Sequence, residues 1–292
     1  MRRMSDPFAI AVCLSSMILG AGSAAGASTL PSSLHDRGTG QPTSLFGTYI
    51  RAGELLVCPF FEYSTDHNRE YQPVQFGFAS DTDFRARYRS TAEQIYVGYG
   101  FSDRLALEFE AGYLRATFDK ASGDHSGTPA RIEERGLGDI EAKLRWRWKT
   151  ETVRWPEIFS FFDVTLPSQR HRRLIGDSDW QFMPGIGLVR GFPWGTMTLR
   201  TDLEYNRETK GFDIGETAIE YLKRLTPSVR GFLAVEGGET GAPDEWNLIA
   251  EGQWQVTGLL ALKLNSSLGI FSKALDWEPQ AGILFSVPAL EP

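Results

Sequence analysis

The amino-acid sequence predicts an all-β fold, a single antiparallel transmembrane β-barrel of about twelve strands. Three observations predict it: apolar and charged side chains alternate in many segments, these segments are long, and the connections between them alternate between long and short. A soluble β-sandwich also shows the alternation, so the segment lengths and the connections decide between the two folds. The mean hydropathy of -0.26 fits either class, because only every second residue of a membrane strand faces lipid.

The alternation is clearest from Asp139 to Lys149, where successive side chains of a strand would point to opposite faces. One face is wholly apolar (Ile140, Ala142, Leu144, Trp146 and Trp148) and the other wholly charged (Asp139, Glu141, Lys143, Arg145, Arg147 and Lys149). Segments of about 11–14 residues exceed the roughly 5–6 of globular strands and suffice for a tilted membrane strand. We predict strands at 52–63, 90–102, 104–119, 136–149, 157–167, 178–191, 196–207, 211–224, 228–239, 244–256, 258–271 and 276–287.

The connections between the predicted strands follow the pattern of an outer-membrane barrel, which has long loops outside and short turns on the periplasmic side. Long connections follow the first, third and fifth strands, at 64–89, 120–135 and 168–177, and short ones follow the second, sixth and tenth, at Asp103, 192–195 and Thr257. Tryptophans lie near the predicted strand ends. Trp246 and Trp254 share one apolar face at a height difference of roughly 19 Å, so we expect aromatic girdles at two interfaces.

The N-terminus predicts export. Arg2 and Arg3 precede an apolar stretch from Phe8 to Leu19, and Ala25-Gly26-Ala27 is a small-x-small cleavage site. We therefore predict a signal peptide at 1–27, a flexible periplasmic leader at 28–51, the barrel at 52–287 and a C-terminal tail at 288–292. Cleavage would leave Cys58 as the only cysteine, so no intramolecular disulfide is expected.

If the apolar faces contact lipid, the charged faces line the lumen. The candidate lumen or constriction residues are Glu108, Glu110, Asp139, Glu141, Lys143, Arg145, Arg147, Arg200, Asp202 and Glu204. So many inward charges require cross-strand pairs, water or both. A barrel of about twelve strands lies between the filled and the open barrels, so the pattern supports either a narrow pore or a salt-bridged plug. The excess of acids would favour cations or neutral solutes over anions.

Two other classes of function have weaker support. The net charge of -7 argues against a nucleic-acid partner, since no basic excess is present to neutralise phosphates. A lipid-modifying barrel enzyme would need a serine and a histidine placed together, and the four histidines (His35, His67, His125 and His171) fall in the leader or in predicted loops. We therefore predict no catalytic residues, no metal site and no cofactor.

Arg170, Arg172 and Arg173 form a basic cluster in the third outer loop. This cluster would bind lipid phosphates at the outer leaflet, fold inward to narrow the pore, or remain solvated. The expected partners are outer-membrane lipid and lipopolysaccharide, the barrel-assembly machinery and a small-molecule solute. The expected location is the outer membrane of a Gram-negative bacterium.

The segment Gly136-Leu137-Gly138-Asp139-Ile140-Glu141-Ala142-Lys143-Leu144 resembles the Gly-x-Gly-Asp strand opening of a bacterial outer-membrane family named for the MetA pathway of phenol degradation. Leu166-Pro167-Ser168 is similar to the proline turn that closes the next strand in that family. The resemblance implies a channel or transporter for small compounds, aromatic ones among them. We expect passive diffusion through a charged lumen, with a structural or adhesive barrel without conductance as the alternative.

Overall fold

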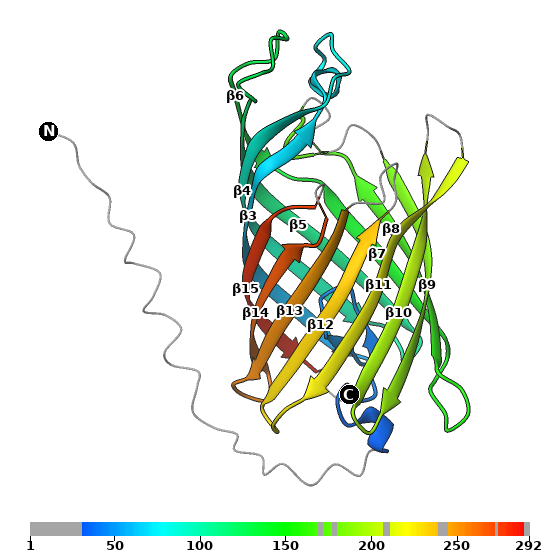
Figure 1. The fold of residues 1–292 in the computed structure, drawn as a ribbon. Helices are drawn as coiled ribbons and strands as arrows, with labels where there is room; N and C mark the ends of the chain where they lie inside the picture. Colours follow the sequence, from blue (N-terminus) through cyan, green and yellow to red (C-terminus); the bar gives the residue numbers. More distant parts are fainter. Residues whose placement is uncertain are drawn as a thin grey trace, which may run out of the picture.

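The computed structural model describes residues 31–168, 172–176, 180–206, 211–238, 245–271 and 274–288. Twelve antiparallel strands form a closed barrel (Figure 1), as predicted. The predicted signal peptide at 1–27 and most of the tail at 288–292 lie outside the described residues. The barrel strands are β3 (Leu55–Tyr71), β4 (Phe84–Gly100), β5 (Leu105–Asp119), β7 (Ile140–Lys149), β8 (Glu157–Leu166), β9 (Gln181–Phe192), β10 (Gly195–Asn206), β11 (Gly211–Arg224), β12 (Val229–Gly238), β13 (Glu245–Gln255), β14 (Leu260–Gly269) and β15 (Trp277–Val287).

The ring closes where β15 pairs antiparallel with β3, so that each barrel strand has a neighbour on both sides. A short extra strand, β6 (Arg131–Leu137), pairs with the distal half of β5, while β7 pairs with the proximal half. Closure pairs the backbone groups that an open sheet edge would leave exposed, which is a requirement for strands in lipid. In the described residues, no helix is long and apolar enough to cross a bilayer.

The outer surface of the barrel is apolar and the inner surface is polar. Leu144, Leu199 and Ile219 are about half exposed on the outside, whereas their chain neighbours Arg145 and Ala218 are buried inside the ring. This confirms the predicted orientation of the alternating segments. Exposed aromatic residues gather near the strand ends, as the girdle hypothesis predicts (Trp148, Trp155, Trp194 and Trp254 at one end; Trp180, Tyr205, Phe212 and Trp277 at the other).

The two ends of the barrel differ. The connections 101–104, 150–156, 193–194, 225–228 and 256–259 lie at one end, here called the short-turn end. The other end, the long-loop end, carries the connections 72–83, 120–130 and 167–180. The predicted first loop at 64–89 is mostly strand, because β3 continues to Tyr71 and β4 begins at Phe84. The hairpin of β3 and β4 and the connection between β5 and β6 both rise above the rest of the barrel (Figure 1).

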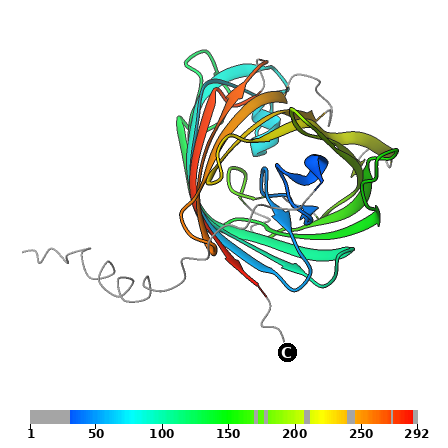
Figure 2. The same ribbon diagram turned by 90° about the horizontal axis from the view of Figure 1, so that it is seen from below.

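Residues 31–51, here called the inner segment, lie inside the barrel near the short-turn end (Figures 1 and 2). The segment contains the 3-10 helix η1 (Ser32–Leu34) and the strands β1 (Gln41–Pro42) and β2 (Tyr49–Ile50), which pair with each other. The structure therefore differs from the flexible leader predicted at 28–51. Its polar composition suggested a solvated linker, but the polar groups bind to the charged inner wall of the barrel.

Apolar side chains of the inner segment complete three small cores inside the ring. Ile50 packs with Leu56, Cys58 and Tyr96, and Leu45 contacts the same cluster. Phe46 and Tyr49 pack against the core around Leu222 and Phe232 on β11 and β12. Tyr49 also contacts the core that contains Phe159, Phe161 and Val189 on β8 and β9. Burial of these side chains stabilises the segment against the wall.

A separate core lies above the barrel at the long-loop end, here called the outer cap. Tyr71, Ala86 and Phe118 are buried there, and Phe76 of the 3-10 helix η2 (Pro73–Phe76) and Leu174 pack against them. The Tyr71 hydroxyl donates a 2.8 Å hydrogen bond to Asp124, a residue of the connection between β5 and β6. The outer cap therefore fixes two long connections to the extended β3–β4 hairpin.

The orientation of β10 can be tested at two positions. Leu199 is 47% exposed on the outer face, midway between the aromatic ends of the strand, and Leu199→Arg should destabilise the barrel in bilayers by about 2–4 kcal/mol. Asp202→Asn should be tolerated, because the Asp202 side chain points inward and its oxygen accepts the Glu216 backbone N–H, which an asparagine oxygen can also accept. The folded fraction of each variant in lipid vesicles can be measured by gel migration with and without boiling. Equal effects would contradict the assigned orientation.

The outer cap should loosen in acid. Burial acts to raise the pKa of Asp124, but hydrogen bonds from Ser126 and Tyr71 and the nearby Lys120 ammonium outweigh it, so this pKa lies below its usual value. A carboxyl group with a lowered pKa stabilises the fold above its unfolded pKa of about 3.9, and the contribution is lost as the pH falls through the folded value. Pepsin cleavage of 72–83 and 120–130 should therefore rise steeply below about pH 4. Asp124→Asn should be cleaved faster than the parent at about pH 5, and the difference should disappear below about pH 4; comparison at each pH removes the pH dependence of pepsin itself. Equal cleavage of parent and variant at about pH 5 would contradict the assignment.

Candidate transport lumen

Two neighbouring cavities occupy the lumen between the inner segment and the long-loop end. Their volumes are about 260 Å³ and 350 Å³, and they share the lining residues Gln94, Glu110 and Glu141. We call them together the chamber. Five carboxylates and two cations line its lower part (Glu62, Glu110, Glu141, Glu216, Glu236, Lys143 and Arg200). The chamber is thus large enough to hold several water molecules, and acidic side chains outnumber basic ones on its lower wall.

Both cations of the chamber are already paired. The Arg200 guanidinium on β10 lies 2.7 Å from Glu220 on β11 and 2.8 Å from Glu236 on β12, and it also forms an ion pair with Glu216. The Lys143 ammonium on β7 lies 2.6 Å from Asp163 on β8. These contacts involve five strands: Arg200 links β10 to β11 and β12, and Lys143 links β7 to β8. They leave no free positive charge on the described part of the chamber wall.

Glu110 and Glu141 face each other directly across the β5–β7 pair, and both line the chamber. Among the described residues neither carboxylate has an ion-pair partner. Two like charges in register repel each other, so a cation or bound water between them would be favourable. These residues give the chamber its uncompensated negative charge.

The floor of the chamber is formed by the inner segment. Leu45 and Phe46 line the chamber, and the Phe46 ring stacks on Phe232 with centroids 5.5 Å apart. The Phe46 carbonyl accepts hydrogen bonds from Lys263 at 2.5 Å and from Gln253 at 3.0 Å. Lys263 in turn pairs with Glu251 at 2.8 Å. Wall side chains therefore satisfy the backbone of the segment where it crosses the lumen.

Ser44 fixes the segment at a second point. Its backbone N–H and its hydroxyl both donate to the Glu108 carboxylate, at 2.7 Å and 2.5 Å. Glu108 is 1% exposed and also forms an ion pair with Arg145 on β7. The same carboxylate thus binds one partner on the wall and one on the inner segment.

A third cavity of about 270 Å³ lies on the other side of the inner segment, at the short-turn end. Thr48 and Tyr49 line it, together with Arg51, Glu54 and Arg224. The inner segment separates this cavity from the chamber. Residues 44–50 thus line the chamber on one side and this cavity on the other.

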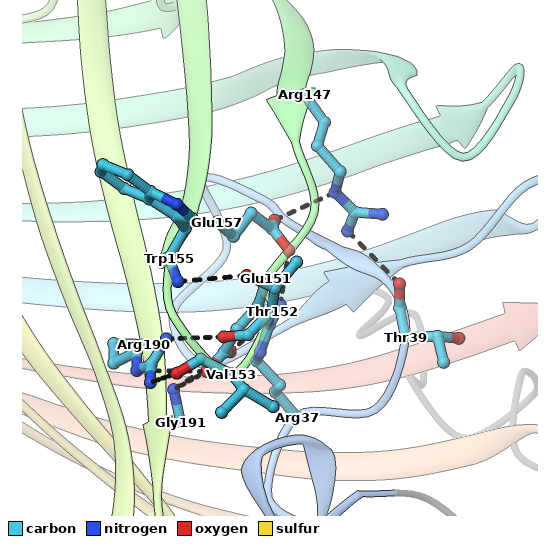
Figure 3. Close-up of polar contacts among 10 residues, drawn as sticks. All are labelled: Arg37, Thr39, Arg147, Glu151, Thr152, Val153, Trp155, Glu157, Arg190 and Gly191. Carbon is cyan, nitrogen blue, oxygen red and sulfur yellow. Dashed lines mark hydrogen bonds and ion pairs between the residues drawn. The ribbon is translucent and has the colours of Figure 1, made fainter.

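A buried ionic cluster, here called the latch, attaches the start of the inner segment to the wall (Figure 3). Arg37 lies 2.9 Å from Glu151, in the connection between β7 and β8, and 2.9 Å from Glu157 on β8. Arg147 lies 3.0 Å from Glu157 and donates to the Thr39 carbonyl at 3.3 Å. The side chains of Arg37, Arg147, Glu151 and Glu157 are each at most 4% exposed, so the cluster is shielded from solvent screening.

Glu151 also ties the latch to the connection 150–156. It accepts the Gly191 backbone N–H at 3.1 Å and lies 3.5 Å from Arg190. Arg190 donates to the carbonyls of Thr152 and Val153 at 2.8 Å and 2.9 Å (Figure 3). A side chain at Gly191 would meet the Ser33 carbonyl at 1.8 Å, so only glycine lets the inner segment pass this close to β9.

The structure places the predicted lumen residues in two groups. Glu110, Glu141, Lys143 and Arg200 line the chamber, with Asp139 in its outer part and Asp202 and Glu204 on the same inner face of β10. Glu108, Arg145 and Arg147 are buried and paired beside the inner segment, so they support it instead of facing an open waist. Arg172 and Arg173 are exposed in the outer connection, and Arg170 lies outside the described residues.

The sequence reasoning missed the latch. Arg37 lies in a polar stretch without periodicity, and Glu151 lies in a connection 114 residues further along the chain. Glu157 did fall at the start of a predicted strand. It lies an even number of residues before Asp163, on the same inward face of that strand, and this alternation was the one signal that could have placed it in the lumen.

Comparison with known proteins gives the fold and no more. No protein-family model matches the sequence, and no curated protein matches it. Among solved structures, the chain is similar to an outer membrane channel from Pseudomonas putida F1, with a TM-score of 0.59 and 14% sequence identity over 85% of this chain and 99% of that chain. The translocator domain of the autotransporter NalP from Neisseria meningitidis gives a TM-score of 0.48 and 10% identity, covering 81% and 89% of the two chains.

The latch makes a testable prediction about Arg37. In Arg37→Gln the wall carboxylates keep Arg147 and Arg190, so the barrel should stay folded while the inner segment loses two charged hydrogen bonds. Each such bond is worth about 1.5–3 kcal/mol, which corresponds to at least about a tenfold rise in local opening. Hydrogen–deuterium exchange of 31–51 should rise, and exchange of the barrel strands should not.

Arg51→Gln is the matched control, because the Arg51 side chain is 58% exposed and bonds only its neighbour Glu54 among the described contacts. Faster exchange of 31–51 in this control than in Arg37→Gln would contradict the role assigned to the latch.

Proposed function

We propose that this protein is an outer-membrane channel that admits small cations and uncharged solutes. The observation that carries the proposal is the chamber: a closed barrel with a lipid-compatible exterior encloses a space whose free charges are carboxylates. A fixed negative field in a narrow lumen favours cations over anions. The similarity to solved outer-membrane barrels supports the fold on which this proposal rests.

The proposal includes location and orientation. An exterior with an apolar band between aromatic ends suits a bilayer, and an N-terminal stretch with the pattern of a signal peptide at 1–27 would direct export. Short turns face the periplasm in bacterial outer-membrane barrels, so the inner segment would lie at the periplasmic side and the outer cap outside the cell. The inner segment and the end of β15 at Val287 both lie at the short-turn end, so both would lie at the periplasmic side.

The solute class follows from the chamber walls. Phe46 and Phe60 line the chamber beside the carboxylates of Glu62 and Glu110, so a small solute with an apolar or aromatic body can contact both. The resemblance noted for the segment 136–144 agrees with aromatic compounds. We propose that transport is passive diffusion. The solute would contact the charges and the apolar surface of the chamber, and no catalytic step would take place.

A structural barrel without conductance is the second candidate. The observation that favours it is the inner segment, which separates the chamber from the cavity at the short-turn end. In a channel, residues 44–50 must move during transport. In a structural barrel they stay in place.

Bilayer recordings separate these functions and test the chamber charges. The parent protein should conduct with a preference for cations in a salt gradient. Glu110→Gln combined with Glu141→Gln should lower the cation preference at least about twofold, because both charges act in a narrow space of low effective dielectric. The reversal potential is the measurement.

Glu93→Gln combined with Glu133→Gln is the matched control, since it removes two carboxylates that are 65% and 64% exposed on the outer surface. This control should keep the reversal potential of the parent. A silent parent would end the channel proposal in favour of a structural barrel, and anion preference in the parent would overturn the assignment of solute charge.

A further inference from the structure

Six arginines gather on the outward face of one sector of the barrel, formed by β4, β5 and β6. They alternate with inward residues such as Ala86, Ser90 and Ala116, which are buried, so their side chains point away from the lumen. Their positions on the extended part of these strands are Arg85, Arg87, Arg89, Arg115, Arg131 and Arg135.

The strand register fixes the height of this arginine face. Tyr113 on β5 pairs with Leu137 on β6, and both are exposed on the apolar exterior, at 39% and 45%. The next outward pair above them is Arg115 and Arg135. Two residues along a strand rise by about 6–7 Å, so these guanidinium groups begin directly above the lipid-facing belt. That is the level of lipid headgroups.

Arg115 and Arg135 face each other in register on the same side of the sheet. Like charges directly opposite on a sheet destabilise it, unless an anion lies between them. Arg115 has one distant carboxylate, Glu93, at 3.8 Å, and its side chain is 62% exposed. Arg85 pairs with Glu70, Arg89 and Arg131 lie 3.6 Å and 3.7 Å from Asp119, and Arg131 also pairs with Glu133. For Arg135 and Arg87 no carboxylate lies within ion-pair distance among the described residues. The face therefore retains positive charge that is not neutralised at Arg87 and Arg135.

The exterior of β8 to β15 has no similar group of arginines among the described residues. On the described parts of β8 to β15, the outward side chains are charged only at Arg190 and Lys223, both at the short-turn end. At the long-loop end of those strands the outward positions are aromatic or apolar, as at Tyr205, Phe212 and Trp277. The arginines are therefore confined to one sector and one height, which a general need for solubility would not produce.

We propose that this arginine face binds the phosphate groups of the glycolipid in the outer leaflet, the lipid A part of lipopolysaccharide. Arginine forms paired hydrogen bonds with phosphate, and a phosphate between Arg115 and Arg135 would remove their mutual repulsion. The acyl chains of the same lipid would lie on the apolar belt below, at Tyr113 and Leu137. The inference requires the outer-membrane location and does not depend on conductance.

Binding of purified lipid A to the refolded full-length protein in detergent tests the proposal, with native mass spectrometry as the readout. Arg115→Gln combined with Arg135→Gln should weaken binding at least about tenfold, since two charge-assisted contacts are lost. Arg51→Gln combined with Arg104→Gln is the control: it removes the same charge from two exposed positions at the short-turn end and should bind as the parent does. Slower migration after boiling confirms that each variant is folded.

Two further arms identify the ligand. Lipid A from which both phosphates have been removed should bind the parent at least about tenfold more weakly than intact lipid A, and inorganic phosphate at millimolar concentration should not displace intact lipid A. Equal binding by the dephosphorylated lipid, displacement by inorganic phosphate, or loss of binding in the control variant alone would each overturn the proposal. The dephosphorylated lipid tests it on the parent even if the double variant does not fold.

Discussion

The structure depends first on the closure of the backbone ladder between β3 and β15. In lipid an unpaired backbone group costs several kcal/mol, so a sheet can cross a bilayer only when its first and last strands meet. Closure then decides where every side chain goes. The outer face must be apolar, and the charged residues of the same strands must share the lumen. Carboxylates such as Glu108, Glu157 and Glu251 are therefore buried and need partners inside the ring.

The inner segment supplies some of the partners that the buried charges of the lumen require. Its backbone has little regular structure of its own, and the charged wall supplies what a sheet would otherwise provide. Glu108 accepts the Ser44 N–H, Lys263 donates to the Phe46 carbonyl, and Arg147 donates to the Thr39 carbonyl. Wall charges and segment backbone satisfy one another, so the polar lumen and the ordered inner segment stabilise each other.

The barrel strands could be predicted because lipid and lumen impose different chemistry on every second residue, and each of the twelve predicted segments overlaps one barrel strand. Because we required an apolar face on every strand, the outer ends of β3 and β4 were not predicted as strands. Above the membrane the outward face carries Arg85, Arg87 and Arg89 where an apolar face was expected, so these residues were assigned to a loop. The inner segment could not be predicted at all. It has no period, and its contacts join residues as far apart as Phe46 and Lys263.

The pairing of the wall bears on whether the inner segment can move. Four wall charges that bind the segment also have a partner on the barrel itself: Arg145 for Glu108, Arg147 for Glu157, Arg190 for Glu151 and Glu251 for Lys263. Withdrawal of the segment would leave each of these four with a counter-ion, so an orphaned charge, the largest electrostatic cost of a buried network, is avoided there. Lys223 and Glu54 differ, because they pair with Asp36 and Arg51 of the segment. What opposes withdrawal is the burial of Leu45, Phe46, Tyr49 and Ile50 together with the hydrogen bonds to the segment. The inner segment is therefore a docked element, and four of the wall charges that hold it stay paired on the barrel without it.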